Sequence, residues 1–200
     1  MFVLGVRKAD RAAAPRVLAL TFAWLALLGV VVATGVVADE PMPRLPVLLA
    51  FTLGCGVAFG CSRTGGRLAQ LPLPALVMFQ AFRLPLEFVL HAWAESGTVP
   101  PTMTWTGQNF DVVSGALALV AAPFAGRIPA AAWLANGVGI VLLANVLRVV
   151  VLSSPLPFAW PIEPPLQLAF HLPYASILPV CVTGALVGHI VLTRALLRRR

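Results

Sequence analysis

Ionisable side chains recur on one helical face of an otherwise apolar stretch near the middle of the chain. Arg83, Glu87 and His91 follow one another at intervals of four residues, and Gln80 precedes them. At about 100° per residue, these four positions span an arc of about 80° on a helix. Because charged groups are unfavourable in hydrocarbon, this stripe must face protein or water. It is the first candidate for a functional site.

Three kinds of chemistry fit this stripe. Glu87 and His91 could share a metal ion with Asp111, His171 or Glu163, although no HExxH motif is present and nearby arginines would compete for the carboxylates. Alternatively, Arg83 and Arg148 could hold an anionic group while Glu87 and His91 exchange protons. The simplest alternative is a buried ion-pair network that only fixes the helices. No cofactor is assigned.

The composition indicates an integral membrane protein. Of the 200 residues, 60% are hydrophobic and 10% are charged, which is unusual for a soluble domain. Several apolar windows reach about 20 residues, the length needed to cross a bilayer. We predict an all-α bundle of six transmembrane helices forming one domain over residues 1–200, with spans at about 17–38, 45–61, 71–93, 110–126, 130–152 and 173–196.

The net charge of +7 reflects the distribution of basic residues between loops, which predicts the topology rather than nucleic-acid binding. The positive-inside rule places both termini in the cytoplasm, and we expect the terminal arginines to meet anionic lipids there. Eleven of the 14 basic residues then lie on the cytoplasmic side, namely Arg7, Lys8, Arg11, Arg16, Arg63, Arg67, Arg127, Arg194, Arg198, Arg199 and Arg200.

This topology predicts a second group of polar residues near the stripe, in the outer half of the bundle. Asn109 and Asp111 enter at the start of the fourth span, and Asn145 and Arg148 approach the same level from the fifth. With Arg83 and Glu87 they would form a network of two acids and two arginines whose formal charges cancel.

A further set of polar residues lies deeper. Gln80, Asn136 and His189 are predicted at comparable depth in the cytoplasmic third. They could continue the stripe as a proton path, but the simpler expectation is that His189 bonds a backbone carbonyl. Ser114 is interpreted as a helix-packing residue.

Other features concern processing and backbone shape. Val36-Val37-Ala38 before Asp39 resembles a signal cleavage site, but the preceding apolar run is too long for a signal core, so we expect a retained span. The cysteines are predicted to be free, because their odd number and lack of a CxxC pair favour no disulfide or structural zinc.

Glycines and prolines predict how the helices pack and bend. GxxxG pairs at Gly56 and Gly60, and at Gly184 and Gly188, predict close helix contacts. Pro85 and Pro179 predict kinks in spans three and six. The proline-rich stretch 153–172 is expected to be either a lid across the outer face, with a short turn near Gln167 to His171, or a simple connector.

The run Phe82-Arg83-Leu84-Pro85-Leu86-Glu87 with His91, and the run Gly107-Gln108-Asn109-Phe110-Asp111, resemble motifs of an uncharacterised family of small bacterial integral membrane proteins. The resemblance extends to His189 and covers about two thirds of the chain. It implies a bacterial source and an inner-membrane location, but no activity.

We therefore expect a multi-pass protein that binds or translocates a small solute, ion or proton at a polar site in its outer half. One alternative is a membrane-embedded enzyme acting on a lipid or isoprenoid, with or without a metal, so the sequence does not decide whether the protein is an enzyme. The other is a non-catalytic assembly subunit. Besides the lipid bilayer, the partners could include further copies of the chain or a larger membrane complex.

Overall fold

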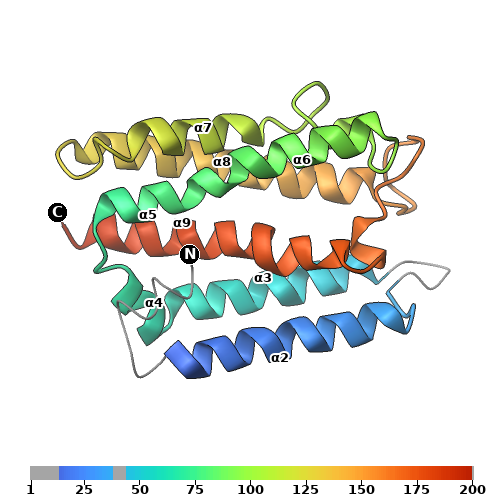
Figure 1. Cartoon of the computed structure of the whole chain (residues 1–200), viewed down its shortest axis with the longest axis horizontal. Coiled ribbons are helices and arrows are strands. Elements are labelled where there is room, and N and C mark those ends of the chain that lie inside the picture. The colour runs from blue at the N-terminus through green and yellow to red at the C-terminus, as the bar shows by residue number, and fades with distance from the viewer. Residues whose placement is uncertain (1–13, 38–43, 200) are drawn as a thin grey trace.

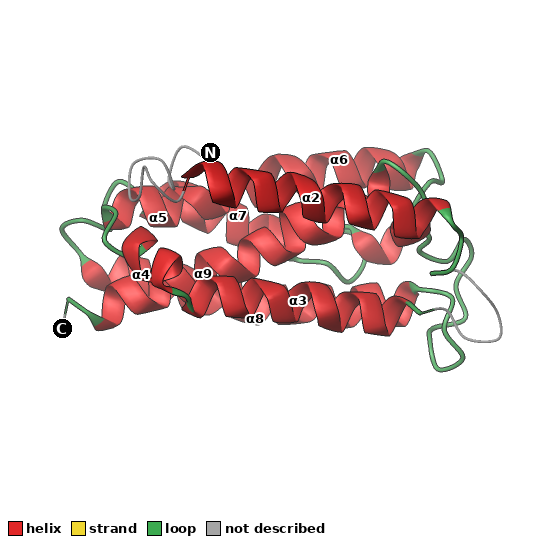
Figure 2. Ribbon diagram, turned by 90° about the horizontal axis from the view of Figure 1, so that it is seen from below, coloured by secondary structure: helices red, strands yellow, loops and turns green. Residues whose placement is uncertain are grey.

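The computed structural model describes residues 14–37 and 44–199. The predictions made for Arg7, Lys8, Arg11 and Arg200, and for the cleavage boundary at Ala38 and Asp39, lie outside the described residues. Within the described ranges the secondary structure is helical and contains no strand. Figures 1 and 2 show the long helices aligned side by side along one axis, with the chain reversing direction between them.

Eight α-helices are present in the described residues. Five shorter helical segments accompany them: the 3-10 turns η1 (Gln80–Phe82), η2 (Pro101–Met103), η3 (Leu168–Phe170) and η4 (Tyr174–Ser176), and the π-helical turn η5 (Leu178–Val182). The α-helices are α2 (Ala14–Ala33), α3 (Leu45–Cys61), α4 (Arg63–Leu68), α5 (Leu73–Phe79), α6 (Arg83–Glu95), α7 (Asp111–Ala121), α8 (Pro129–Ser153) and α9 (Thr183–Leu197).

The apolar helices fit a membrane protein. In the described part of the chain, four helical stretches are long and apolar enough to cross a bilayer: Ala14–Ala33, Leu73–Glu95, Pro129–Ser153 and Tyr174–Leu197. The predicted second and fourth spans correspond to α3 and α7, which are shorter, at 17 and 11 residues. The six expected helical regions are therefore present, while the crossing of the bilayer by all six stays a prediction.

Large apolar side chains on the outside of the bundle agree with a lipid surround. Leu20 and Val47 are each 70% exposed, and Val141 is 68% exposed. Because such groups are unfavourable in water, an apolar medium is the environment that suits these faces. The interior contains many small residues, among them Ala122 and Ala132, which allow neighbouring helices to approach closely.

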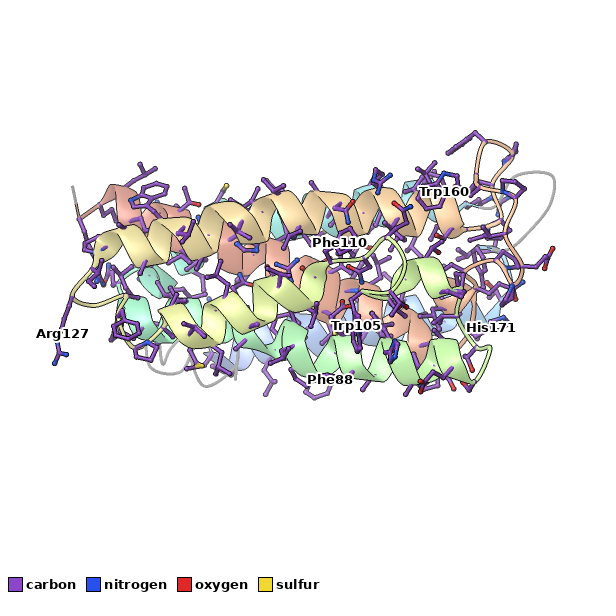
Figure 3. The ribbon with its side chains drawn as sticks, turned by 90° about the horizontal axis from the view of Figure 1, so that it is seen from above. Phe88, Trp105, Phe110, Arg127, Trp160 and His171 are labelled. Atoms are coloured by element: carbon purple, nitrogen blue, oxygen red, sulfur yellow. The ribbon has the colours of Figure 1, made fainter. Side chains whose placement is uncertain are left out.

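The two ends of the bundle differ in their charged residues. Figure 3 shows Arg127 at one end, and Trp160 and His171 toward the other. At the Arg127 end α3, α7 and α9 finish, and this end also carries Arg63, Arg67 and Arg194. The opposite end, called here the Trp160 end, carries the α6–α7 connection and the 154–173 segment.

Both predicted proline sites depart from α-helical geometry. Ahead of Pro85 the helix tightens into η1, and around Pro179 it widens into η5. Proline removes a backbone donor and crowds the preceding turn, so the local hydrogen-bonding pattern changes there. The helix Leu73–Glu95 thus has its irregular turn immediately before Arg83.

The proline-rich segment folds back onto the helices. The Leu166 N–H donates to the Ser153 carbonyl oxygen over 2.6 Å, and the Trp160 N–H donates to the Leu152 carbonyl oxygen over 2.7 Å. The expected short turn is present as η3. Leu166 packs with buried Val99, so this segment covers part of the Trp160 end and is more than a simple connector.

Candidate functional site

The guanidinium group of Arg83 lies at the centre of a buried polar network. Its Nε donates to Asp111 Oδ2 over 2.5 Å, and its Nη2 pairs with Asp111 Oδ1. Its Nη1 lies 2.9 Å from Ser114 Oγ, 3.1 Å from the Gly139 carbonyl oxygen and 3.0 Å from His189 Nε2. Arg83 is only 1% exposed. One side chain of α6 thereby connects α7, α8 and α9.

Glu87 lies one helical turn beyond Arg83 and has a different partner. The Asn109 Nδ2 group donates to Glu87 Oε1 over 2.9 Å and to Oε2 over 3.1 Å, and it also contacts the Met103 carbonyl oxygen at 3.1 Å. The Asp111 N–H donates to Asn109 Oδ1 over 3.1 Å, an Asx turn that begins α7. Asn109 therefore fixes the orientation of Glu87 and the start of α7 together.

Two glycines allow this network to form by letting helices approach closely. A Cβ on Gly115 would lie 2.3 Å from the Leu84 backbone nitrogen, so the backbones of α6 and α7 approach closely at this glycine. Asp111 lies one helical turn before Gly115 on α7. A Cβ on Gly139 would lie 2.4 Å from His189 Cε1. A side chain at position 115 would push apart α6 and α7, which carry Arg83 and Asp111, and a side chain at position 139 would displace the His189 ring.

His189 extends the network toward the Arg127 end. Its Nδ1 lies 2.9 Å from Asn136 Oδ1, and Asn136 Nδ2 donates to Thr193 Oγ1 over 2.7 Å. The Thr193 hydroxyl then donates to the His189 carbonyl oxygen over 2.8 Å. The expected bond from the His189 ring to a backbone carbonyl is thus replaced by bonds to Arg83 and Asn136, because Gly139 brings the ring to the centre of the bundle.

A cavity of about 80 Å³ opens beside the network toward the Trp160 end. Its polar wall consists of Arg83, Glu87, Asn109 and Asp111. The remaining wall is apolar apart from Tyr174. It is formed by α3, α6, α8, the proline-rich segment and the chain from η4 into α9. Its residues include Leu45, Leu49, Leu90, Val146, Leu166, Leu168, Leu178 and Cys181. A space of this size holds several water molecules or a short apolar group.

The site contains more negative than positive formal charge. Among the residues that the structure describes, Arg83 is the only Lys or Arg side chain that lines the cavity, whereas both Glu87 and Asp111 line it. Arg148, which we expected to balance them, lies instead in a separate exposed cluster. Its Nη2 donates to Gln108 Oε1 and Asn145 Oδ1 over 3.1 and 2.9 Å.

That exposed cluster also includes Trp160 and the backbone of the α6–α7 connection. The Arg148 guanidinium carbon lies 5.4 Å from the centroid of the Trp160 ring. Asn145 Nδ2 donates to the Gln108 carbonyl oxygen over 2.8 Å. Asn145 and Arg148 therefore attach the α6–α7 connection to α8 at the surface and take no part in the buried network.

The remaining residues of the predicted stripe have separate surroundings. His91 stacks on Trp105, with ring centroids 4.1 Å apart, and its Nε2 lies 3.7 Å from Glu95 Oε1. Gln80 is buried and donates to the Ala185 carbonyl oxygen over 3.2 Å. Neither side chain joins the Arg83 network. The stripe therefore divides into Arg83 and Glu87, which line one cavity, and Gln80 and His91, which have other partners.

The weak metal candidates are not brought together. His171 is exposed and lies 3.4 Å from Gln167 Oε1, on the proline-rich segment. Among the residues that the structure describes, no group of three or more His, Cys, Asp or Glu side chains is placed to hold a metal ion. All three cysteines, Cys55, Cys61 and Cys181, are free.

Two members of the network were not identified as site residues from the sequence. Ser114 was interpreted as a packing residue, yet its hydroxyl contacts Arg83; its position three residues after Asp111 places both on one face of α7. The Gly139 carbonyl has no side-chain signal at all. Comparisons with known protein families, curated proteins and solved structures found no match to the chain.

Proposed function

We propose that this multi-pass membrane protein binds a small amphiphilic solute, with a hydrogen-bond-donating or cationic head, in the cavity beside Glu87. The observation that carries the proposal is the contrast in the cavity wall, where a mainly apolar lining contains one carboxylate that retains acceptor capacity. Small-molecule sites commonly combine an apolar lining with a few placed polar groups.

The donors and acceptors of the polar wall favour this class of ligand. Arg83 already directs Nε and both Nη nitrogens to protein partners, and both oxygens of Asp111 contact Arg83. Glu87, by contrast, accepts only from the single Nδ2 nitrogen of Asn109. Since an ionised carboxylate has about four acceptor positions, Glu87 can receive further donors from a ligand.

The balance of charge points the same way. With two acids and one arginine on its wall, the cavity favours an ammonium group over a carboxylate or phosphate. Arg148, the cation that could attract an anion, is bonded to Gln108 and Asn145 outside the cavity. The sequence-based idea that two arginines hold an anionic head therefore receives no support from this arrangement.

A proton path is a less favourable use of the same residues. Hydrogen bonds do run from Asp111 through Arg83 and His189 to Asn136 and Thr193. A relay needs groups that both release and accept protons, however, and a guanidinium is not deprotonated in proteins. Arg83 would therefore interrupt proton transfer, and binding is the better-supported proposal.

The two alternative functions, a membrane-embedded enzyme and an assembly subunit, are each favoured by one observation. The apolar lining of the cavity would suit the chain of a lipid or isoprenoid substrate, and the closed bonding around Arg83 would suit a subunit that only assembles. We place the Trp160 end outside a bacterial inner membrane, because Arg63, Arg127 and Arg194 gather at the opposite end.

The proposal can be tested through Cys181, which lines the cavity. A protein retaining only this thiol, with Cys55→Ala and Cys61→Ala, is placed in nanodiscs. The rate of its modification by methyl methanethiosulfonate is measured by intact mass. Three probes of equal chain length, n-butylammonium, n-butanol and n-butanoate, are compared at equal concentrations in the bilayer.

We expect n-butylammonium to protect Cys181 at about one tenth of the concentration that the other probes need, since a hydrogen bond to a charged group contributes about 1.5–3 kcal/mol. Glu87→Gln should remove this preference, and Glu95→Gln, an exposed carboxyl on the same helix, should keep it. Protection by none of the probes would refute the binding site. Equal protection by all three would leave the site and refute the ligand class.

A further inference from the structure

The π-helical turn η5 forms the part of the cavity wall that leads into α9. Three of its residues, Leu178, Cys181 and Val182, line the cavity. Its wide geometry is evident in the bonding of Thr183, whose N–H donates to the Leu178 carbonyl oxygen, five residues back. In an α-helix the same N–H would donate to the Pro179 carbonyl oxygen, four residues back. The turn therefore holds one residue more than an α-helix would hold in its place.

The π-turn leaves the hydroxyl group of Thr183 unsatisfied. Its Oγ1 atom is buried and has no hydrogen-bond partner among the described residues. Three other helical threonines, Thr21, Thr52 and Thr193, each donate to the carbonyl oxygen four residues earlier, over 2.8, 2.7 and 2.8 Å. This is a common bond of a threonine inside an α-helix. The corresponding acceptor for Thr183 is the Pro179 carbonyl, so conversion of the turn to an α-helix would satisfy the hydroxyl.

Pro179 has the opposite preference. Proline lacks an N–H, and in an α-helix its ring crowds the carbonyl four residues earlier, here that of Ala175. Widening of the turn relieves this contact. The α form would therefore satisfy the Thr183 hydroxyl, whereas the π form accommodates the Pro179 ring. Because these two residues favour different forms of one short turn, the turn has two forms of similar free energy.

The helix that follows η5 is held in place, whereas the chain before it is short and irregular. Thr183 packs so closely on α3 that a Cβ built on Gly56 would lie 2.5 Å from Thr183 Cγ2, and His189 contacts Arg83. Before η5 come the 3-10 turn η4 and the proline-rich segment. A change from π to α would therefore move the stretch before Pro179. One residue leaves the wide turn, so this stretch would rotate by about 100° and shift by about 1.5 Å.

This movement would break a contact between two walls of the cavity at its Trp160 end. Tyr174 of η4 lines the cavity, and its ring meets Trp93 of α6 edge to face, with centroids 5.1 Å apart at 90°. A shift of one residue places Ala175 where Tyr174 now lies and turns the Tyr174 ring away from Trp93. The π form therefore keeps the mouth of the cavity narrow, and the α form widens it.

We propose that η5 is a gate for the cavity, narrow in its π form through the contact of Tyr174 with Trp93 and wide in its α form. The purpose of the gate rests on the proposed binding function, because the gate sets how readily a solute reaches Glu87. The change in the turn itself needs no ligand. A solute that fills the cavity contacts the wall that η5 completes and so favours the π form.

The test uses the fact that Tyr174 is the only tyrosine of the chain. The protein is labelled with 3-fluorotyrosine and placed in nanodiscs, and its fluorine NMR spectrum is recorded without a ligand. We expect one resonance for each form of the turn. Trp93→Leu identifies the resonance of the π form, because the tryptophan ring shifts that resonance and leaves the other in place.

Two variants should change the ratio of α form to π form in opposite directions. Pro179→Ala supplies an N–H and removes the ring, so the ratio should rise about tenfold or more. Thr183→Val keeps the branched shape but has no hydroxyl to satisfy, so the ratio should fall about fivefold, the effect of one hydrogen bond. Thr52→Val is the matched control, because its hydroxyl is already bonded to the Leu48 carbonyl oxygen, and it should leave the ratio unchanged. Thermal unfolding in the same discs verifies that each variant is folded.

The gate and the binding function can fail separately in these measurements. If no second resonance appears in the wild type or in any folded variant, the gate is overturned. Equal responses to Thr183→Val and Thr52→Val would overturn it as well. If the binding function alone is wrong, n-butylammonium will neither protect Cys181 nor change the ratio, while the variants at positions 179 and 183 still change it. If both proposals hold, n-butylammonium raises the share of the π form.

Discussion

Removing the charge of Asp111 should destabilise the bundle far more than removing the charge of Glu87. Asp111→Asn takes away the carboxylate that contacts both Nε and Nη2 of Arg83. One amide oxygen can replace only one of those contacts, and the amide nitrogen would face a donor. A fully buried guanidinium then loses its direct counter-charge, while in Glu87→Gln the oxygen that accepts from Asn109 can be kept.

The expected magnitudes differ accordingly. Breaking a buried ion pair by changing one partner costs about 3–5 kcal/mol, because the other charge is left uncompensated. Glu87→Gln loses part of a single hydrogen-bonding arrangement and should cost about 1 kcal/mol. Glu95→Gln, with its carboxyl 72% exposed and 3.7 Å from His91, should change the stability by less than about 0.5 kcal/mol.

These free energies of unfolding can be measured by titrating sodium dodecyl sulfate into mixed micelles and following the far-ultraviolet circular dichroism. The predicted order is Asp111→Asn, then Glu87→Gln, then Glu95→Gln. If Asp111→Asn cost no more than Glu87→Gln, the Arg83–Asp111 pair would not be what holds α6 to α7. The assignment of a structural role to Asp111 would then be refuted.

Two further predictions concern the same network. Gly139→Ala should cost about 1–3 kcal/mol in the same titration, because its Cβ would lie 2.4 Å from the His189 ring, whereas Gly137→Ala, which meets nothing within 4 Å, should not destabilise the protein. Arg83→Met combined with Asp111→Leu should be more stable than either single change, since an apolar pair can replace a buried ion pair; additive losses would contradict this.

The sequence predicted helices well and their lengths less well. Hydropathy is a local property, and the expected range 45–61 coincides with α3. The expected range 110–126 was too long, because α7 ends at Ala121, two residues before Pro123. Proline disfavours the helical conformation of the residue before it. Because Pro123 lies inside an apolar run, hydropathy alone overestimated the length of this helix.

Depth along a helix was predicted more accurately than direction around it. Asp111 and Asn109 do meet Arg83 and Glu87, as their shared level suggested. Arg148 lies near that level but not on the buried face of α8, which runs through residues such as Asn136, Gly139, Leu143, Val146 and Val149. Position 148 is about 100° from its buried neighbour at 149, which turns its side chain to the surface.

The network centre depended on features that carry little sequence signal. A backbone carbonyl at Gly139 and the close approach of α6 to α7 at Gly115 follow from tertiary packing. A glycine in an apolar helix has many packing uses, and nothing local indicates which helix it meets. The sequence could therefore predict the depth in the bundle at which Arg83 finds its partners, but not which atoms those partners are.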